Sequence, residues 1–95
     1  MSEQLNRLAV RLKNLEGSTP TAKVILSKAS EVASEIANIY EIDPFYNVEN
    51  KKKVIRSARE LSVALADGTT HEYREAAKLL EAIAKVAEAI NAGIP

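Results

Sequence analysis

The amino-acid sequence predicts an all-α fold, an up-down-up-down four-helix bundle with a short first helix. Three observations favour this fold. In four separate stretches, apolar residues recur at steps of three and four, a spacing that places them on one face of an α-helix. Residue types that begin or end helices separate those stretches. The connections are short, and short connections make consecutive helices antiparallel neighbours.

The first helix is expected over residues 3–16. Its apolar stripe consists of Leu5, Leu8, Leu12 and Leu15. Gly17 is expected to end the helix in the left-handed C′ conformation that glycine tolerates. At about 1.5 Å per residue this helix is about 21 Å long, whereas each of the other three reaches about 30 Å. Either other side chains fill the end of the bundle that the first helix does not reach, or part of an apolar groove stays open.

The second helix is expected over residues 20–41. Thr19 is a suitable N-cap, and Pro20 fits the first helical position because its missing N–H is not needed there. Asp43 and Pro44 should end the helix, since proline cannot continue the hydrogen-bond ladder. The predicted centre of its apolar stripe is Ala22, Ile25, Ala29, Val32, Ile36 and Ile39, with Leu26, Ala33 and Tyr40 to one side.

The third helix is expected over residues 46–67. Its N-cap is either Asp43, with Pro44 as the first helical residue, or Asn47, and we favour the later start. Asp67 and Gly68 should end it. The residues expected to face inward are Val48, Ile55, Ala58, Leu61, Ser62 and Leu65, with Val54 beside them.

The fourth helix is expected over residues 70–92. Thr69 followed by Glu72 is a capping-box pattern, in which each side chain satisfies a backbone donor of the other residue. Gly93 should end the helix. The apolar seam consists of Tyr73, Ala76, Leu80, Ile83, Ala87 and Ile90.

Length and composition predict one helical-bundle domain over residues 1–95, with a single core. Thirteen basic and thirteen acidic residues cancel, which disfavours steering toward nucleic acid or an anionic membrane. The absence of cysteine excludes disulfides and thiolate metal sites. No apolar run approaches the ~20 residues of a membrane span, and the first residues do not resemble a signal peptide. We therefore expect a soluble monomer.

No residue pattern indicates catalysis, a cofactor or a metal. His71, the only histidine, shares a helix face with Glu75, but two ligands fall short of the three or four that a metal site needs. The three glycines stand singly, so no glycine-rich phosphate loop exists. Ser27, Ser30 and Ser34 lie near one face without a base, and hydrolytic serine chemistry requires one. We assign no site residues and expect no enzymatic activity.

A cationic segment runs along the expected third helix. Its residues are Lys51, Lys52, Lys53, Arg56 and Arg59. Adjacent lysines on a helix point about 100° apart, so the three lysines do not form one binding stripe. Glu49 is expected to pair with Lys53, and Glu60 with Arg56, at i,i+4 spacing. This segment therefore indicates a solvated helix face and no nucleic-acid partner.

Tyr40, Phe45 and Tyr46 form an aromatic group at the connection between the second and third helices. They could be a recognition patch, since aromatic residues are enriched at interfaces. We favour a plug over the end of the bundle, because a small core needs every large side chain that it can bury.

Two hypotheses of function remain. In the first, the chain is a de novo designed or redesigned helical-bundle scaffold without intrinsic activity, which agrees with the start and stop signals at every junction and with the balanced charge. Irregular features, such as residues 47–53 and the many β-branched core residues, argue against an idealised design. In the second, the chain is a natural interaction module that binds a partner helix in an incompletely covered groove.

Overall fold

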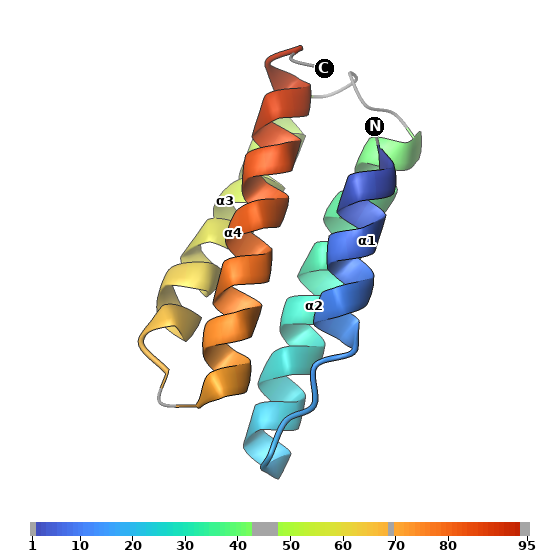
Figure 1. Cartoon of the computed structure of the whole chain (residues 1–95). Coiled ribbons are helices and arrows are strands. Elements are labelled where there is room, and N and C mark those ends of the chain that lie inside the picture. The colour runs from blue at the N-terminus through green and yellow to red at the C-terminus, as the bar shows by residue number, and fades with distance from the viewer. Residues whose placement is uncertain (1, 43–47, 69, 94–95) are drawn as a thin grey trace.

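The computed structural model describes residues 2–42, 48–68 and 70–93, and these contain four helices and no strands. Two antiparallel hairpins, one on each side of the core, make up the molecule (Figure 1). The predicted all-α, up-down-up-down bundle with a short first helix is confirmed, and the observed helix ends lie within three residues of the predicted ones. The helices are α1 (Ser2–Lys13), α2 (Pro20–Ile42), α3 (Val48–Ala66) and α4 (His71–Asn91).

The cross-section of the bundle is a rhombus rather than a square. α1 packs against α2 and α4, and α3 packs against α4 and α2. α2 also contacts α4 across the bundle, whereas the described residues of α1 and α3 do not touch. The short diagonal requires small side chains, because two helix backbones approach closely there. Both helices carry buried alanines, at positions 29, 33 and 37 of α2 and at 76, 77, 84 and 87 of α4.

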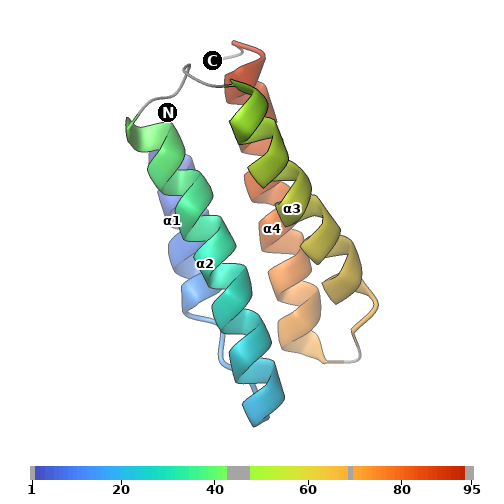
Figure 2. The ribbon, with the colours of Figure 1, turned by 180° about the vertical axis from the view of Figure 1, so that it is seen from behind.

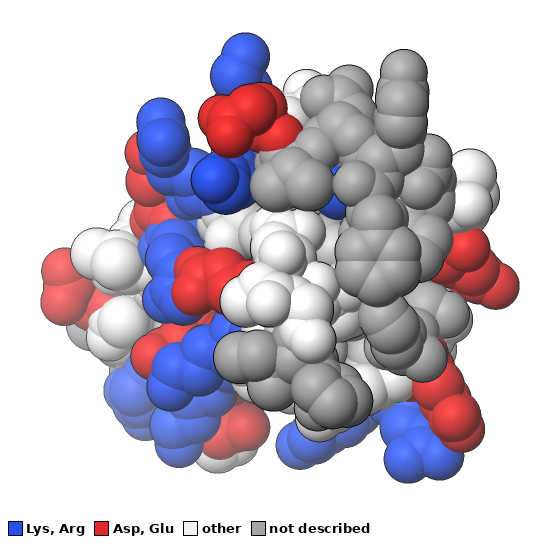
Figure 3. Space-filling view, turned by 90° about the horizontal axis from the view of Figure 1, so that it is seen from above, with Lys and Arg blue, Asp and Glu red and all other residues white. Residues whose placement is uncertain are grey.

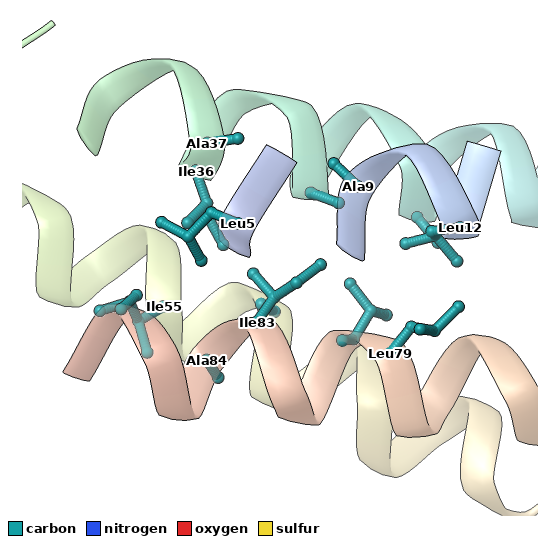
Figure 4. Packing of buried hydrophobic residues seen from close by; sticks show 14 of the residues in the cluster. Leu5, Ala9, Leu12, Ile36, Ala37, Ile55, Leu79, Ile83 and Ala84 are labelled. Atoms are coloured by element: carbon teal, nitrogen blue, oxygen red, sulfur yellow. The ribbon is translucent and has the colours of Figure 1, made fainter. Parts of the chain in front are cut away.

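The centre of the core is filled by side chains from α1, α2 and α4. The largest fully buried ones are Leu5, Leu12, Ile36, Leu80 and Ile83. Figure 4 shows core side chains of the two hairpins pointing toward one another. Burial of Ile36, Leu80 and Ile83 was predicted and is confirmed, as is the apolar seam of α4 apart from half-buried Tyr73. The prediction that Leu61 is well buried is wrong, since its side chain is only half-buried.

α2 is turned about its axis relative to the predicted stripe, whereas α3 buries the predicted Ile55, Ala58, Ser62 and Leu65 and differs at Leu61 and Lys51. In α2 the Leu26, Ala33 and Tyr40 side is buried, whereas the predicted central residues Ile25, Val32 and Ile39 are half-buried. The reason is that α2 packs more extensively against α1 than against α3, which draws the α1-facing side inward. In α3 the buried residues are Lys51, Ile55, Ala58, Ser62 and Leu65, with Val54 and Leu61 at the edge.

The first connection differs from its prediction at Gly17. α1 ends at Lys13, and Gly17 is not left-handed, because the only described glycine with positive φ is Gly93, at 75°. Gly17 instead lies against the backbone of α2, where an added Cβ would be 2.6 Å from the Lys23 nitrogen. Thr19 is confirmed as the N-cap of α2, since its Oγ1 accepts a hydrogen bond from the Ala22 N–H at 3.0 Å. Gly93 ends α4 as predicted.

The predicted capping box of the fourth helix is wrong. The N-cap of α4 is Thr70, which makes Glu72 the second helical residue and leaves it one position too early for a capping box. The Glu72 carboxylate instead accepts hydrogen bonds from the Ser18 N–H (3.0 Å) and hydroxyl (2.6 Å). Thr69 and the helix boundary signals at Asp43, Pro44 and Asn47 lie outside the described residues.

Candidate functional site

His71 and Glu75 do not converge on a metal site. His71 is exposed at the first position of α4, and Glu75 forms an ion pair with Lys78 at 3.6 Å. Among the residues that the structure describes, no group of three or more His, Cys, Asp or Glu side chains is placed to hold a metal ion. The chemistry available around His71 is therefore that of a solvated helix start.

Ser27, Ser30 and Ser34 line a groove of about 1090 Å³ between α2 and the end of α1, which we call the serine groove. The groove exists because α1 ends at Lys13, halfway along α2, and the chain then continues without helical structure to Thr19. Leu12, Leu15 and Leu26 contribute apolar surface. The lining contains no histidine, and its titratable residues are Lys13, Glu16, Lys23, Glu31 and Glu35.

The cationic segment separates into two parts. Lys52, Arg56 and Arg59 line a groove of about 570 Å³ beside Glu88 and Asn91 of α4. These residues are spaced four and three positions apart, which places them on one face of α3. The orientation of the three adjacent lysines did not predict this shared face.

Two of these three cations already have acidic partners. Lys52 pairs with Glu49 at 3.4 Å, and Arg59 pairs with Glu88 at 2.7 Å. The predicted partner of Glu49, Lys53, is therefore wrong, and the predicted pair of Glu60 with Arg56 is not among the ion pairs of the described residues. The Arg59 hydrogen bond holds the pKa of the Glu88 carboxyl below its usual value. In the end-on view, basic and acidic side chains are interleaved over the described surface (Figure 3).

Lys51 is buried, contrary to the prediction that the cationic segment is solvated. Its side chain is only 3% exposed, and its Nζ lies 5.2 Å from the centre of the Tyr40 ring. A lysine over an aromatic face is a favourable cation–π arrangement. Lys51 lies four and seven residues before Ile55 and Ala58, and this spacing is the sequence signal that it shares their buried face.

Tyr40 closes the described end of the core. The residue is 3% exposed, and its hydroxyl donates a hydrogen bond to Asn91 Oδ1 at 2.6 Å, which ties α2 to α4. Burial raises the pKa of the Tyr40 phenol above its ordinary value. The burial of Tyr40 agrees with the predicted plug over the end of the bundle rather than with a recognition patch. Phe45 and Tyr46 lie outside the described residues.

The comparisons with known proteins add no family. No family model, curated protein or solved structure matches the chain. None of the helices in the described residues is long and apolar enough to cross a membrane.

Proposed function

We propose that the chain is a self-contained helical-bundle scaffold that performs no chemistry of its own and needs no partner in order to fold. The observation that carries this proposal is the docking of the short first helix. Leu5 is 0% exposed and Leu12 is 1% exposed, so α1 contributes two of the five largest fully buried side chains. A twelve-residue helix is marginal in isolation, and this burial against α2 and α4 is what would hold it.

The scaffold proposal includes a designed or redesigned origin. Support comes from the helix junctions, where Thr19 caps α2 with its hydroxyl and Gly93 ends α4 with a left-handed residue. Further support comes from charges that cancel and from ion pairs within single helices, as between Glu3 and Arg7 or Glu81 and Lys85. Design procedures impose agreement among the helix caps, the apolar pattern and the arrangement of charges.

The test compares two aspartate substitutions on α1. Leu12→Asp places an unpaired charge in the core, and we expect it to lower the free energy of unfolding by more than about 3 kcal/mol. Val10→Asp is the control, because Val10 is 54% exposed, and we expect a change within about 0.5 kcal/mol. Thermal unfolding followed by circular dichroism measures both. The unmodified chain should unfold cooperatively and bind no hydrophobic dye, and dye binding by the folded chain would contradict the proposal.

A second candidate function is the binding of a partner helix, and the serine groove is the observation that favours it. Its apolar contributions from Leu12, Leu15 and Leu26 would contact an apolar helix face, with serines along the rim. If the groove is a binding site, a hydrophobic dye should bind the folded chain, Leu15→Ser should abolish the signal, and Val10→Ser should leave it. The scaffold proposal expects no signal in any of the three proteins.

A further inference from the structure

One side of α2 carries apolar residues that the rest of the described bundle covers only in part. Ile25, Val32 and Ile39 follow one another at intervals of seven and are half-buried, while Val24 and Ile42 are 70% and 75% exposed. In the view from behind, α2 lies in front of α1 (Figure 2). We call this surface the α2 outer face. Its residues are Val24, Ile25, Lys28, Val32, Glu35, Ile39 and Ile42, all within about 100° of the helix circumference.

Two opposite charges stand within the α2 outer face. Lys28 and Glu35 are both exposed, and neither forms an ion pair with another residue in the described ranges. Elsewhere on the bundle, acidic and basic side chains often pair within one helix or with its neighbour, as in Glu3–Arg7 and Arg59–Glu88. Lys28 and Glu35 are seven residues apart on one helix, too far to pair with each other.

The α2 outer face is self-complementary about Val32. Lys28 lies four residues before Val32, and Glu35 lies three residues after it. Ile25 and Ile39 lie seven residues before and after Val32, about 10.5 Å away in each direction along the helix. A two-fold axis at the level of Val32 places Ile25 opposite Ile39 of a second copy, and it brings Lys28 within one residue, about 1.5 Å along the helix, of the level of Glu35 of that copy. An interface between identical copies related by a two-fold axis requires this kind of reciprocity.

We propose that two copies of this chain pair antiparallel through their α2 outer faces. The seven-residue spacing of Ile25, Val32 and Ile39 is the spacing of a coiled-coil seam. Parallel pairing would set Lys28 against Lys28 and Glu35 against Glu35, so the charges select the antiparallel arrangement. The dimer replaces the monomer expected from the sequence, and it forms between copies that are already folded.

Because each copy contributes only one helix face, the dimer interface buries a small area, and small interfaces are typical of weak association. We expect a dissociation constant between about 10 µM and 1 mM. Sedimentation equilibrium from about 10 µM to 2 mM should show the average mass rising from 10.4 kDa toward twice that value.

Charge reversal tests which surface carries the association. Lys28→Glu and Glu35→Lys each turn two attractive contacts of the dimer into two repulsive ones, and each should weaken association about tenfold or more. The double variant Lys28→Glu/Glu35→Lys restores the complementarity with inverted signs and should associate within about threefold of the original chain. Lys23→Glu is the matched control, because Lys23 is exposed about 140° around α2 from Lys28, and it should leave association unchanged. Lys23 lies in the serine groove, which Glu35 also lines from the side of the α2 outer face.

Three results would overturn the pairing: a monomer mass for the unmodified chain at every concentration, association that neither single reversal weakens, or a double variant that fails to restore it. Circular dichroism of each protein at low concentration keeps this proposal separate from the scaffold proposal. A chain that is monomeric yet fully helical would refute the pairing and leave the scaffold standing.

Discussion

At the scale of single residues, Gly17 shows that a glycine near a helix end can be required for space rather than for backbone conformation. The sequence predicts that Gly17 takes the left-handed C′ conformation. Among the described glycines, only Gly93 has this conformation. Gly17 lies close to the first turn of α2. The fold brings these residues together, so the sequence alone does not predict the contact.

Gly17→Ala should destabilise the bundle by about 1 to 3 kcal/mol, because its Cβ would meet backbone atoms that cannot move aside as a side chain does. The matched substitution is Gly93→Ala, where nothing lies within 4 Å of the added Cβ and only the left-handed backbone opposes it. Urea unfolding measures both. An effect of Gly17→Ala no larger than that of Gly93→Ala would contradict the close packing.

Tyr40 gives a prediction at alkaline pH. Its phenol pKa is raised by burial, so the folded chain holds the proton more strongly than the unfolded chain, whose pKa is about 10. The resulting stability is fully present below pH 10 and is lost as the pH rises through the folded pKa. Tyr40→Phe should remove this alkaline loss, and near neutral pH it should cost about 1 kcal/mol through the lost bond to Asn91. Unfolding curves between about pH 7 and 11 measure both effects, and an alkaline loss that persists in Tyr40→Phe would contradict this assignment.

At the scale of the elements, the existence, order and length of the four helices could be predicted from the sequence, because periodicity and cap residues are local properties. The rotation of α2 could not be predicted in this way. Ile25 and Leu26 both belong to a broad apolar stripe, and the contact of α2 with α1 decides which of them is fully buried. The position of Lys51 was missed for a related reason, since composition marks a lysine as exposed while its spacing places it beside Ile55.

Truncation to alanine tests the position of Leu61 at the edge of the core. Ile36→Ala, Leu80→Ala and Ile83→Ala should each lower the free energy of unfolding by about 2 to 5 kcal/mol, through lost burial and a residual cavity. Leu61→Ala should cost less than about 2 kcal/mol, because its half-buried side chain leaves a smaller cavity. Equal losses at Leu61 and Ile83 would show that Leu61 is as deeply buried as the sequence predicts.

The contact between Ser18 and Glu72 fastens the first connection to α4 and gives a prediction at acidic pH. The hydrogen bond from the Ser18 hydroxyl lowers the pKa of the Glu72 carboxyl. A lowered folded pKa contributes stability that is present above the unfolded pKa of about 4.3 and is lost as the pH falls through the folded pKa. Ser18→Ala should raise the Glu72 pKa toward its ordinary value, as measured by NMR titration of the carboxyl carbon. Ser27→Ala serves as the control, and an unchanged Glu72 pKa in Ser18→Ala would rule out this contact in solution.

At the scale of the whole molecule, the rhombic packing explains how a bundle with one short helix closes its core. α2 and α4, which both carry buried alanines, meet on the short diagonal, and α1 docks beside them with Leu5 and Leu12. The same packing leaves two features on the surface of α2, the serine groove on the α1 side and the α2 outer face on the other. The candidate sites could not be predicted from the sequence, because each depends on where α1 ends and which way α2 turns.

Hydrogen exchange of the α1 amides tests the central claim, that the chain is self-contained, most directly. An undocked helix of 12 residues would exchange almost as fast as an unfolded chain. At low micromolar concentration, where the proposed dimer is dissociated, the amides of Ala9 and Leu12 should be protected to nearly the same free energy as those of Leu80 and Ile83. Unprotected α1 amides beside protected α4 amides would contradict the claim, because the first helix would then be free and its partner surface open.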